Sequence, residues 1–340
     1  MGSVIIYRML IIYMKKCVCV CMYVCTHTHT RTECLCCFSE MSSDLEEELN
    51  ALLSGGAAPL PDQYDMMSES PRPLKLRHNV CYIVVGVLLN EQDEVLMMQE
   101  AKAECLGTWY LPAGRLERGE TLVDGLCREV KEETGLTCEP ITLLAVEERG
   151  AAWVRFVFLA QHTGGSLKSP ASADKESIQA SWWDRVSPLP LRCRDILPLI
   201  KLALEYRNQP SHPYMLPLLY PSPFLILRML LVCLTTPGEL WVLQSASSPA
   251  RLPTAVCATH GGSLLNPLRS LLQDPPKSYG ILGVQHQGGD GADGVCLTVM
   301  GVFNGLKPPR VRVHSLSWVL MENEELKNSI EKATLLPLYS

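Results

Sequence analysis

The chain has 340 residues, of which 47% are hydrophobic and 19% are charged, and its formal net charge is −6 at pH 7. This length allows two globular domains. An acidic chain without a stripe of Lys and Arg is not expected to form a nucleic-acid surface. We therefore expect a folded protein whose partner is a small molecule.

Residues 1–40 differ in composition from the rest of the chain. They alternate Cys with Val and then Thr with His, as in CVCVCMYVCTHTHT, a pattern typical of a translated dinucleotide repeat rather than of a disulfide or metal tract. The apolar residues 4–14 contain Arg8 and are too short to span a bilayer. We expect a disordered or non-native leader, a functional start at Met41, and no membrane association.

Residues 41–78 predict a short N-terminal helix followed by a flexible, Pro-rich linker. Leu45, Leu49 and Leu52 recur at helical spacing, and the stretch APLPDQYDMMSESPRP follows Gly55. The cysteines beyond residue 40 are scattered without paired spacing. That scatter is typical of reduced thiols, so we expect a cytoplasmic protein.

Residues 79–207 predict a first domain that opens with a β-hairpin. Two apolar runs, at 79–89 and 95–98, are separated by the polar turn NEQDE. Leu96 and Met98 share one face by strand alternation. They are candidate substrate-binding residues, with plain core packing as the alternative.

Residues 114–136, GRLERGETLVDGLCREVKEETGL, predict an amphipathic helix at 120–134 that ends before Gly135. At about 100° per residue, Glu129, Glu132 and Glu133 fall on one face, beside the apolar stripe of the helix. Like charges at this spacing destabilise a helix unless a cation neutralises them. Carboxylates suit Mg²⁺, with Mn²⁺ as an alternative, and Mg²⁺ commonly binds substrate phosphates as well. A metal-complexed polyphosphate is therefore the expected substrate.

Arg128 is always charged and cannot ligate a metal, but it can pair with Glu120 or Glu129 and fix the carboxylate. The segment before the helix ends in Ala113 and Gly114, where a glycine allows the backbone to approach closely. Glu176 lies in a polar loop further along the chain. It is a candidate base or ligand, with a solvated loop charge as the alternative and Glu147 and Glu148 as rivals.

The same segment resembles the Nudix box of pyrophosphohydrolases, G-x5-E-x7-R-E-U-x-E-E-x-G-U with U aliphatic. The matching residues are Gly114, Glu120, Arg128, Glu129, Val130, Glu132, Glu133, Gly135 and Leu136. The resemblance implies that the Ala113 carbonyl, with Gly114 beside it, joins Glu129, Glu132 and Glu133 at the metal. It leaves open whether Glu129 is a ligand or the base.

Strands are expected at 142–147, 153–160 and 181–183, and a helix at 195–207. The resemblance implies the Nudix α/β/α sandwich with a mixed sheet. Trp153, or Trp182 and Trp183, could stack on a purine, although core packing is the alternative for each.

Residues 211–340 predict a second, α+β domain. Its apolar runs and turns follow the order of the first domain, and LLNPLRSLLQD stands where the box helix would be, but no REUxEE pattern is present. We expect either a degenerate Nudix-like repeat without metal chemistry or an unrelated module.

The stretches NVCYIVVGVLLNEQDEVLMMQEAKAECLGTWYLPAGRLERGE, LLAVEERG and WVRFVFLA resemble Nudix hydrolases that act on oxidised purine nucleoside diphosphates. The implied activity is hydrolysis of 8-oxo-dGDP and 8-oxo-GDP, and of oxidised adenine diphosphates, to monophosphate and phosphate. Such an activity sanitises the nucleotide pool. The alternatives are a broader nucleoside diphosphate or ADP-ribose hydrolase, and a non-catalytic RNA- or protein-binding module. The sequence leaves the oligomeric state open.

Overall fold

The computed structural model describes residues 41–67, 71–150, 152–236, 238–258, 262–272, 276 and 278–339. The predictions for residues 1–40 lie outside these residues. Within them, no helix has both the length and the apolar character needed to cross a membrane.

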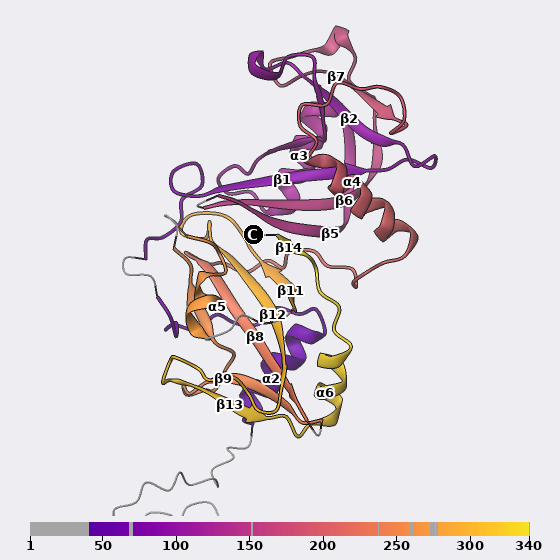
Figure 1. Ribbon diagram of the computed structural model, residues 1–340. Coiled ribbons are helices and arrows are strands. Elements are labelled where there is room, and N and C mark those ends of the chain that lie inside the picture. Colours follow the sequence, from indigo (N-terminus) through magenta and orange to yellow (C-terminus); the bar gives the residue numbers. More distant parts are fainter. Residues whose placement is uncertain are drawn as a thin grey trace, which may run out of the picture. The chain divides into compact units, whose positions relative to one another are not determined.

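The first half of the described chain is an α/β/α sandwich (Figure 1). Its elements in chain order are β1 (Cys81–Leu88), β2 (Val95–Glu100), the 3₁₀ turn η1 (Ala103–Cys105), β3 (Trp109–Tyr110), β4 (Ala113–Arg115), α3 (Leu122–Thr134), β5 (Leu136–Gly150), β6 (Trp153–Gly165), the 3₁₀ turn η2 (Pro170–Ser172), β7 (Ser177–Trp183) and α4 (Ile196–Asn208). Strand β1 runs parallel to β6 and antiparallel to β4, and β6 runs antiparallel to β5. Strands β3, β2 and β7 form a separate small sheet. The mixed sheet expected from the sequence is therefore confirmed.

Strand alternation divides β1 between the two helices of the sandwich. Tyr82 and Val84 belong to the hydrophobic cluster that contains the apolar stripe of α3. Val85 and Val87 belong to the cluster that contains Ile196 and the other buried residues of α4. The sheet is consequently buried on both faces, and its α4 face carries the cavity described below.

The second half repeats this pattern of strands. Its elements are β8 (Leu225–Thr235), β9 (Leu240–Ser245), β10 (Thr254–Val256), α5 (Asn266–Leu271), β11 (Ser278–Gln285), β12 (Val295–Gly305), β13 (Leu316–Leu320), α6 (Glu324–Glu331) and β14 (Leu338–Tyr339). Strand β8 is parallel to β12 and antiparallel to β10, β12 is antiparallel to β11, and β9 is antiparallel to β13. In the first half, β1 is likewise parallel to β6 and antiparallel to β4, β6 is antiparallel to β5, and β2 is antiparallel to β7. The second half differs in that β9 also pairs with β8, so β8 to β13 form one sheet. A Nudix-like repeat, with α5 in the place of α3, stays a prediction.

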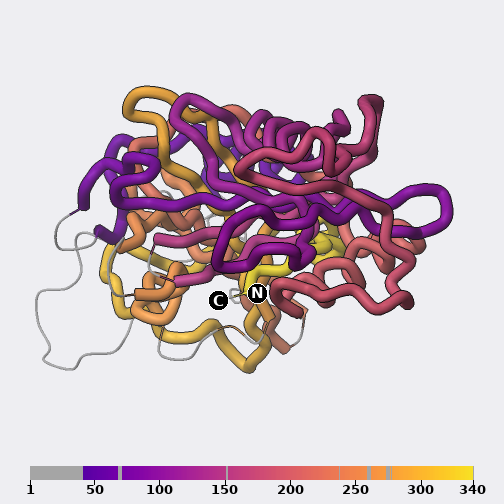
Figure 2. The backbone as a smooth tube through the Cα atoms, turned by 90° about the horizontal axis from the view of Figure 1, so that it is seen from above, coloured from indigo at the N-terminus to yellow at the C-terminus, as the bar shows by residue number. Residues whose placement is uncertain are grey.

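The two halves are joined by a strand and by a shared core. Strand β14 pairs in parallel with β5, so the yellow end of the chain lies among strands of the first half (Figures 1 and 2). The cluster around Tyr82 continues into Leu227 and Met229 of β8. Because residues 39–340 form one compact unit, the predicted boundaries at 79–207 and 211–340 stay a prediction.

The N-terminal helix α2 (Ser43–Leu53) packs on the second half. The hydroxyl of its N-cap, Ser42, accepts the Leu45 N–H at 3.3 Å. Its buried leucines share a cluster with Leu230 and Val232 of β8 and with Ile330 of α6. The helix expected within 41–78 is therefore present, although its partner lies far along the chain.

The segment after α2 is held by the buried side chain of Arg228. This guanidinium donates to the carbonyl oxygens of Ala58 at 3.0 Å and Pro59 at 2.7 Å. It also pairs with Glu48 at 3.1 Å. Residues 58–59 therefore differ from the flexible linker that their composition predicts, because a cation more than 160 residues away binds their backbone.

Candidate active site

Helix α3 carries the acidic residues and has well-defined ends. Thr121 is its N-cap and forms a reciprocal capping box with Asp124, and Gly135 ends the helix in the left-handed region at φ 79°. The predicted span, 120–134, is thus correct to within two residues at its start. Leu122, the first helical residue, begins the buried stripe that fixes which face meets the sheet.

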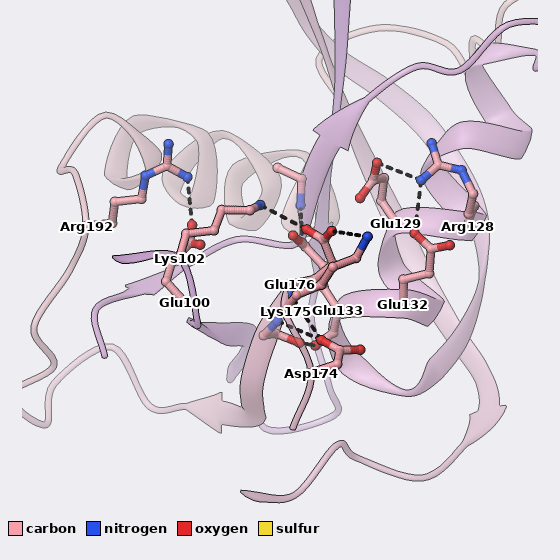
Figure 3. A network of polar contacts seen from close by, with 12 residues as sticks. Glu100, Lys102, Arg128, Glu129, Glu132, Glu133, Asp174, Lys175, Glu176 and Arg192 are labelled. Carbon is pink, nitrogen blue, oxygen red and sulfur yellow. Dashed lines mark hydrogen bonds and ion pairs between the residues drawn. The ribbon is translucent and has the colours of Figure 1, made fainter. Parts of the chain in front are cut away.

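The three glutamates Glu129, Glu132 and Glu133 project from the same helix (Figure 3) but differ in burial. Glu133 is only 2% exposed, and one of its carboxylate oxygens accepts the Ala113 N–H at 2.8 Å. Glu132 is about half exposed, and Glu129 lies between these extremes. Burial raises the pKa of Glu133 well above its ordinary value, and it also raises the pKa of Glu129 although Arg128 opposes the shift. These carboxylates are therefore costly to keep charged without a cation.

Gly114, in β4, faces the Glu129 carboxylate. A Cβ atom at this position would overlap the carboxyl group of Glu129. Only glycine therefore lets strand β4 approach α3 this closely. The sequence predicts a close backbone approach here, and the partner that the structure shows is Glu129.

Arg128 holds the acidic residues together. It donates to Glu120 at 2.5 and 2.9 Å, to Glu129 at 2.7 Å and to Glu132 at 3.1 Å, and it also donates to the Arg115 carbonyl oxygen at 3.1 Å. Although burial opposes the shift, the hydrogen bonds from Arg128 and from the Glu117 amide lower the pKa of Glu120. The pairing expected of Arg128 is present, whereas its role in fixing the carboxylates for catalysis stays a prediction.

Glu176 approaches the site from the loop before β7. One of its carboxylate oxygens lies 3.2 Å from Lys102 Nζ, and both residues face the acidic helix (Figure 3). Glu176 also raises the pKa of Glu129 through its charge, after burial and the adjacent Glu132. The structure therefore brings Glu176 to the box glutamates, as a base or ligand there would require.

A cavity of about 550 Å³ opens beside these groups. Its lining residues are Arg77, Ile83, Val85, Lys102, Tyr110, Ala113, Gly114, Arg115, Glu117, Arg128, Glu129, Glu132, Trp153, Arg155, Glu176 and Arg192. Acidic groups of α3 therefore face basic side chains and an aromatic ring across one cavity. This combination suits a phosphorylated ligand with a flat, apolar part.

The candidate substrate-binding residues separate in the structure. Trp153 lines the cavity, is 41% exposed, and stacks with the Arg115 guanidinium at 5.6 Å. Leu96 and Met98 are fully buried in β2 and are absent from the cavity lining, so their placement near the nucleotide is not supported. Period-two alternation identifies a shared face but cannot tell a core face from a cavity wall. Trp182 and Trp183 also lie away from this cavity.

The rival glutamates at the end of β5 have other partners. Glu148 accepts the Ser263 hydroxyl and the Leu264 N–H of the second half, each at 2.8 Å. Glu147 pairs with Arg155. Neither glutamate lines the cavity, so the structure does not favour either of them as the base.

Four residues that line this cavity were not expected from the sequence: Lys102, Tyr110, Arg155 and Arg192. The signal for Arg155 is its charge within the apolar strand WVRFVFLA. A charged side chain that points into a sandwich needs partners, and such groups gather at functional sites.

The acidic groups fit a divalent cation chemically. Within the described residues, no three His, Cys, Asp or Glu side chains are already gathered as a metal centre. Arg128 engages Glu129 and Glu132, and the Ala113 amide engages Glu133. The set nevertheless offers oxygen donors only, which suits Mg²⁺ or Mn²⁺. A cation there would favour the charged forms of Glu129 and Glu133, which burial disfavours.

The NUDIX domain family matches residues 81–193, the region that contains α3 and this cavity. Together with the relatives described next, which are 41–47% identical to this chain over most of its length, this match shows that the chain belongs to the Nudix hydrolases and is an enzyme of that class.

Its relatives include proteins named 8-oxo-dGDP phosphatase NUDT18. The human protein is 47% identical over 283 residues, which cover 77% of this chain and 86% of the relative. The mouse protein is 45% identical over 291 residues, covering 78% and 89% of the two chains. The zebrafish protein is 41% identical over 326 residues, covering 88% and 98%. The similarity thus extends well beyond the NUDIX domain.

Proposed function

We propose that this chain hydrolyses oxidised purine nucleoside diphosphates, chiefly 8-oxo-dGDP and 8-oxo-GDP, to monophosphate and phosphate with Mg²⁺. The observation that carries the proposal is that one cavity is lined by Glu129 and Glu132 of the box, by basic side chains and by Trp153. The substrate is supported by 41–47% identity to proteins named 8-oxo-dGDP phosphatase. The scattered free cysteines support a cytoplasmic enzyme.

The proposed ligands of the cation are Glu129, Glu132, Glu133 and the Ala113 carbonyl. When bound, Mg²⁺ neutralises the phosphate charge and lowers the pKa of the attacking water. Glu176 accepts the proton of that water, since it borders the cavity and lies near Glu129.

Basic side chains hold the diphosphate in this proposal. Lys102 lies beside Glu176 and can turn to a phosphate oxygen as charge develops there. Arg128 releases Glu132 to the cation but keeps Glu120, with which it makes its shortest contact at 2.5 Å. Arg128 therefore positions the helix carboxylates rather than touching the reacting atoms.

The first test identifies the reaction products by ³¹P NMR, with 8-oxo-dGDP as the substrate and Mg²⁺ present. We expect inorganic phosphate and 8-oxo-dGMP, with no turnover when chelator replaces Mg²⁺. Faster cleavage of ADP-ribose would favour the broader hydrolase. No turnover of any diphosphate, together with binding of RNA or a protein, would favour the binding module.

The second test measures the metal directly, as Mn²⁺ affinity by electron paramagnetic resonance. Glu133→Gln keeps the size of the side chain and an oxygen that can accept the Ala113 N–H, but removes the charge. We expect its Mn²⁺ affinity to fall at least about tenfold. Glu139→Gln, on the exposed edge of β5, is the matched control and should bind Mn²⁺ normally. Equal affinity in both variants would contradict the metal assignment.

A further inference from the structure

Arg155 occupies the floor of the substrate cavity. It lies on β6, opposite Ile83 of β1 and Glu147 of β5, so these side chains share one face of the sheet. Its side chain is only 5% exposed, yet it lines the cavity together with Trp153. A guanidinium this deeply buried normally has its donors satisfied by acceptors.

Two of its nitrogens are satisfied by the protein. Nε donates to the Glu147 carboxylate, and Nη1 donates to Asp195 Oδ2 at 2.7 Å and to the Tyr110 hydroxyl at 3.1 Å. The Tyr110 hydroxyl in turn donates to Asp195, 3.0 and 3.1 Å from its two oxygens. The orientation of the guanidinium is therefore fixed by three partners from three different elements.

The third nitrogen of Arg155, Nη2, is buried and has no acceptor among the described residues. A buried donor left unpaired is unfavourable, and it gains a partner when a ligand supplies an acceptor. Because the other two nitrogens are held, Nη2 presents its N–H groups in a fixed direction. Arg155 also lines the cavity, so this donor without an acceptor belongs to a residue of the cavity wall.

The charge around Arg155 indicates which kind of acceptor fits. Glu147 and Asp195 face the two guanidinium groups of Arg155 and Arg149, the latter bonded to Asp195 at 2.5 Å. Two negative and two positive charges cancel within this cluster. A neutralised guanidinium attracts a phosphate weakly but still donates strongly to a neutral carbonyl oxygen.

We propose that Arg155 determines base specificity by donating from Nη2 to a carbonyl oxygen of the purine while the diphosphate lies at the box. This inference rests on the proposed function. Guanine carries a carbonyl at C6 and 8-oxoguanine a second one at C8, whereas adenine carries an amino group at C6. The amino group at C6 of adenine is a hydrogen-bond donor. If it faces Nη2 of Arg155, neither donor has an acceptor, so adenine is disfavoured.

The test compares wild type with Arg155→Lys and Arg155→Met on 8-oxo-dGDP, dGDP, 8-oxo-dADP and dADP. Arg155→Lys keeps a positive charge beside Glu147 and Asp195. It therefore tests the role of Nη2 even if Arg155→Met does not fold. Loss of one hydrogen bond from a charged donor should lower kcat/KM about 10- to 100-fold. The loss should appear only for bases with the carbonyl that Arg155 binds, and dADP should be unaffected.

A second readout is independent of metal and of turnover. The binding affinities for 8-oxo-dGMP and dAMP are measured by calorimetry without Mg²⁺. Only the affinity for 8-oxo-dGMP should fall in the Arg155 variants. Arg149→Lys, whose guanidinium meets the same Asp195 but does not line the cavity, is the matched control and should keep the discrimination. Equal losses for all four diphosphates, or no loss for any, would overturn the assignment of Arg155. If the proposed function is wrong, the wild type itself will show no higher kcat/KM for the oxidised diphosphates than for the ordinary ones, which separates that outcome from a wrong assignment of Arg155.

Discussion

Gly288, in the loop between β11 and β12, links the second half of the chain to the Nudix box, residues 114–136. Its φ is 79°, and a Cβ atom there would overlap the backbone carbonyl of Glu120. Gly291, in the same loop, has a similar φ of 74°, but a Cβ atom there meets nothing within 4 Å. Gly288→Ala and Gly291→Ala therefore form a matched pair that differs in the contact with Glu120.

The expected effects follow from these two geometries. A non-glycine residue in the left-handed region costs about 1–2 kcal/mol, which both variants share. Gly288→Ala also overpacks the Glu120 contact, which adds about 1–3 kcal/mol to its loss in the free energy of unfolding. Displacing Glu120 also loosens Arg128, which holds Glu129 and Glu132. We expect kcat/KM to fall about 10- to 100-fold in Gly288→Ala only.

The assays are urea unfolding and phosphate release under identical conditions. Stability is measured first, so that activity can be compared where both variants are fully folded. If the two variants lose the same stability and keep the same kcat/KM, the loop does not position the box, and the reasoning is refuted.

Three further predictions concern other parts of the chain. Arg228→Met should reduce the free energy of unfolding by about 3–5 kcal/mol, because it leaves the buried Glu48 and the carbonyl oxygens of Ala58 and Pro59 without their partner, and the added change Glu48→Gln should recover the part due to Glu48 in urea denaturation. The side-chain interaction with Cys138 lowers the pKa of the Cys127 thiol, whose Sγ lies 3.5 Å from the Cys138 carbonyl oxygen. Cys138→Ala should therefore move the alkylation of Cys127 to higher pH, and an unchanged pH profile would count against this pairing. Removal of residues 1–40 should leave phosphate release unchanged, because the site lies within residues 77–192, and loss of activity would contradict the interpretation of this segment as a spurious leader.

The sequence predicts the elements whose signals are local. The stripe of α3 repeats at helical spacing, and Gly135 ends the helix in the left-handed conformation. The presence of strands in the second half follows from its likeness to the first, although their order in the sheet differs. The placing of Glu129, Glu132 and Glu133 beside the stripe is correct because helical geometry alone determines it.

The features that the sequence does not predict depend on distant contacts. The partners of Arg155 include Asp195, 40 residues away. The segment after α2 is held by Arg228, at a separation of 170 residues from Ala58. Leu96 shows the reverse case: it lies close to the box in sequence, but its side chain belongs to the core, which was the alternative left open for it. No local pattern contains such information.

Specificity for the oxidised base is measured as the ratio of kcat/KM for 8-oxo-dGDP to kcat/KM for dGDP, with Mg²⁺ and purified protein of residues 1–340. We expect a ratio well above one, and a near-complete loss of both activities in Glu133→Gln. Equal values for the two diphosphates, or full activity in Glu133→Gln, would contradict the proposed function.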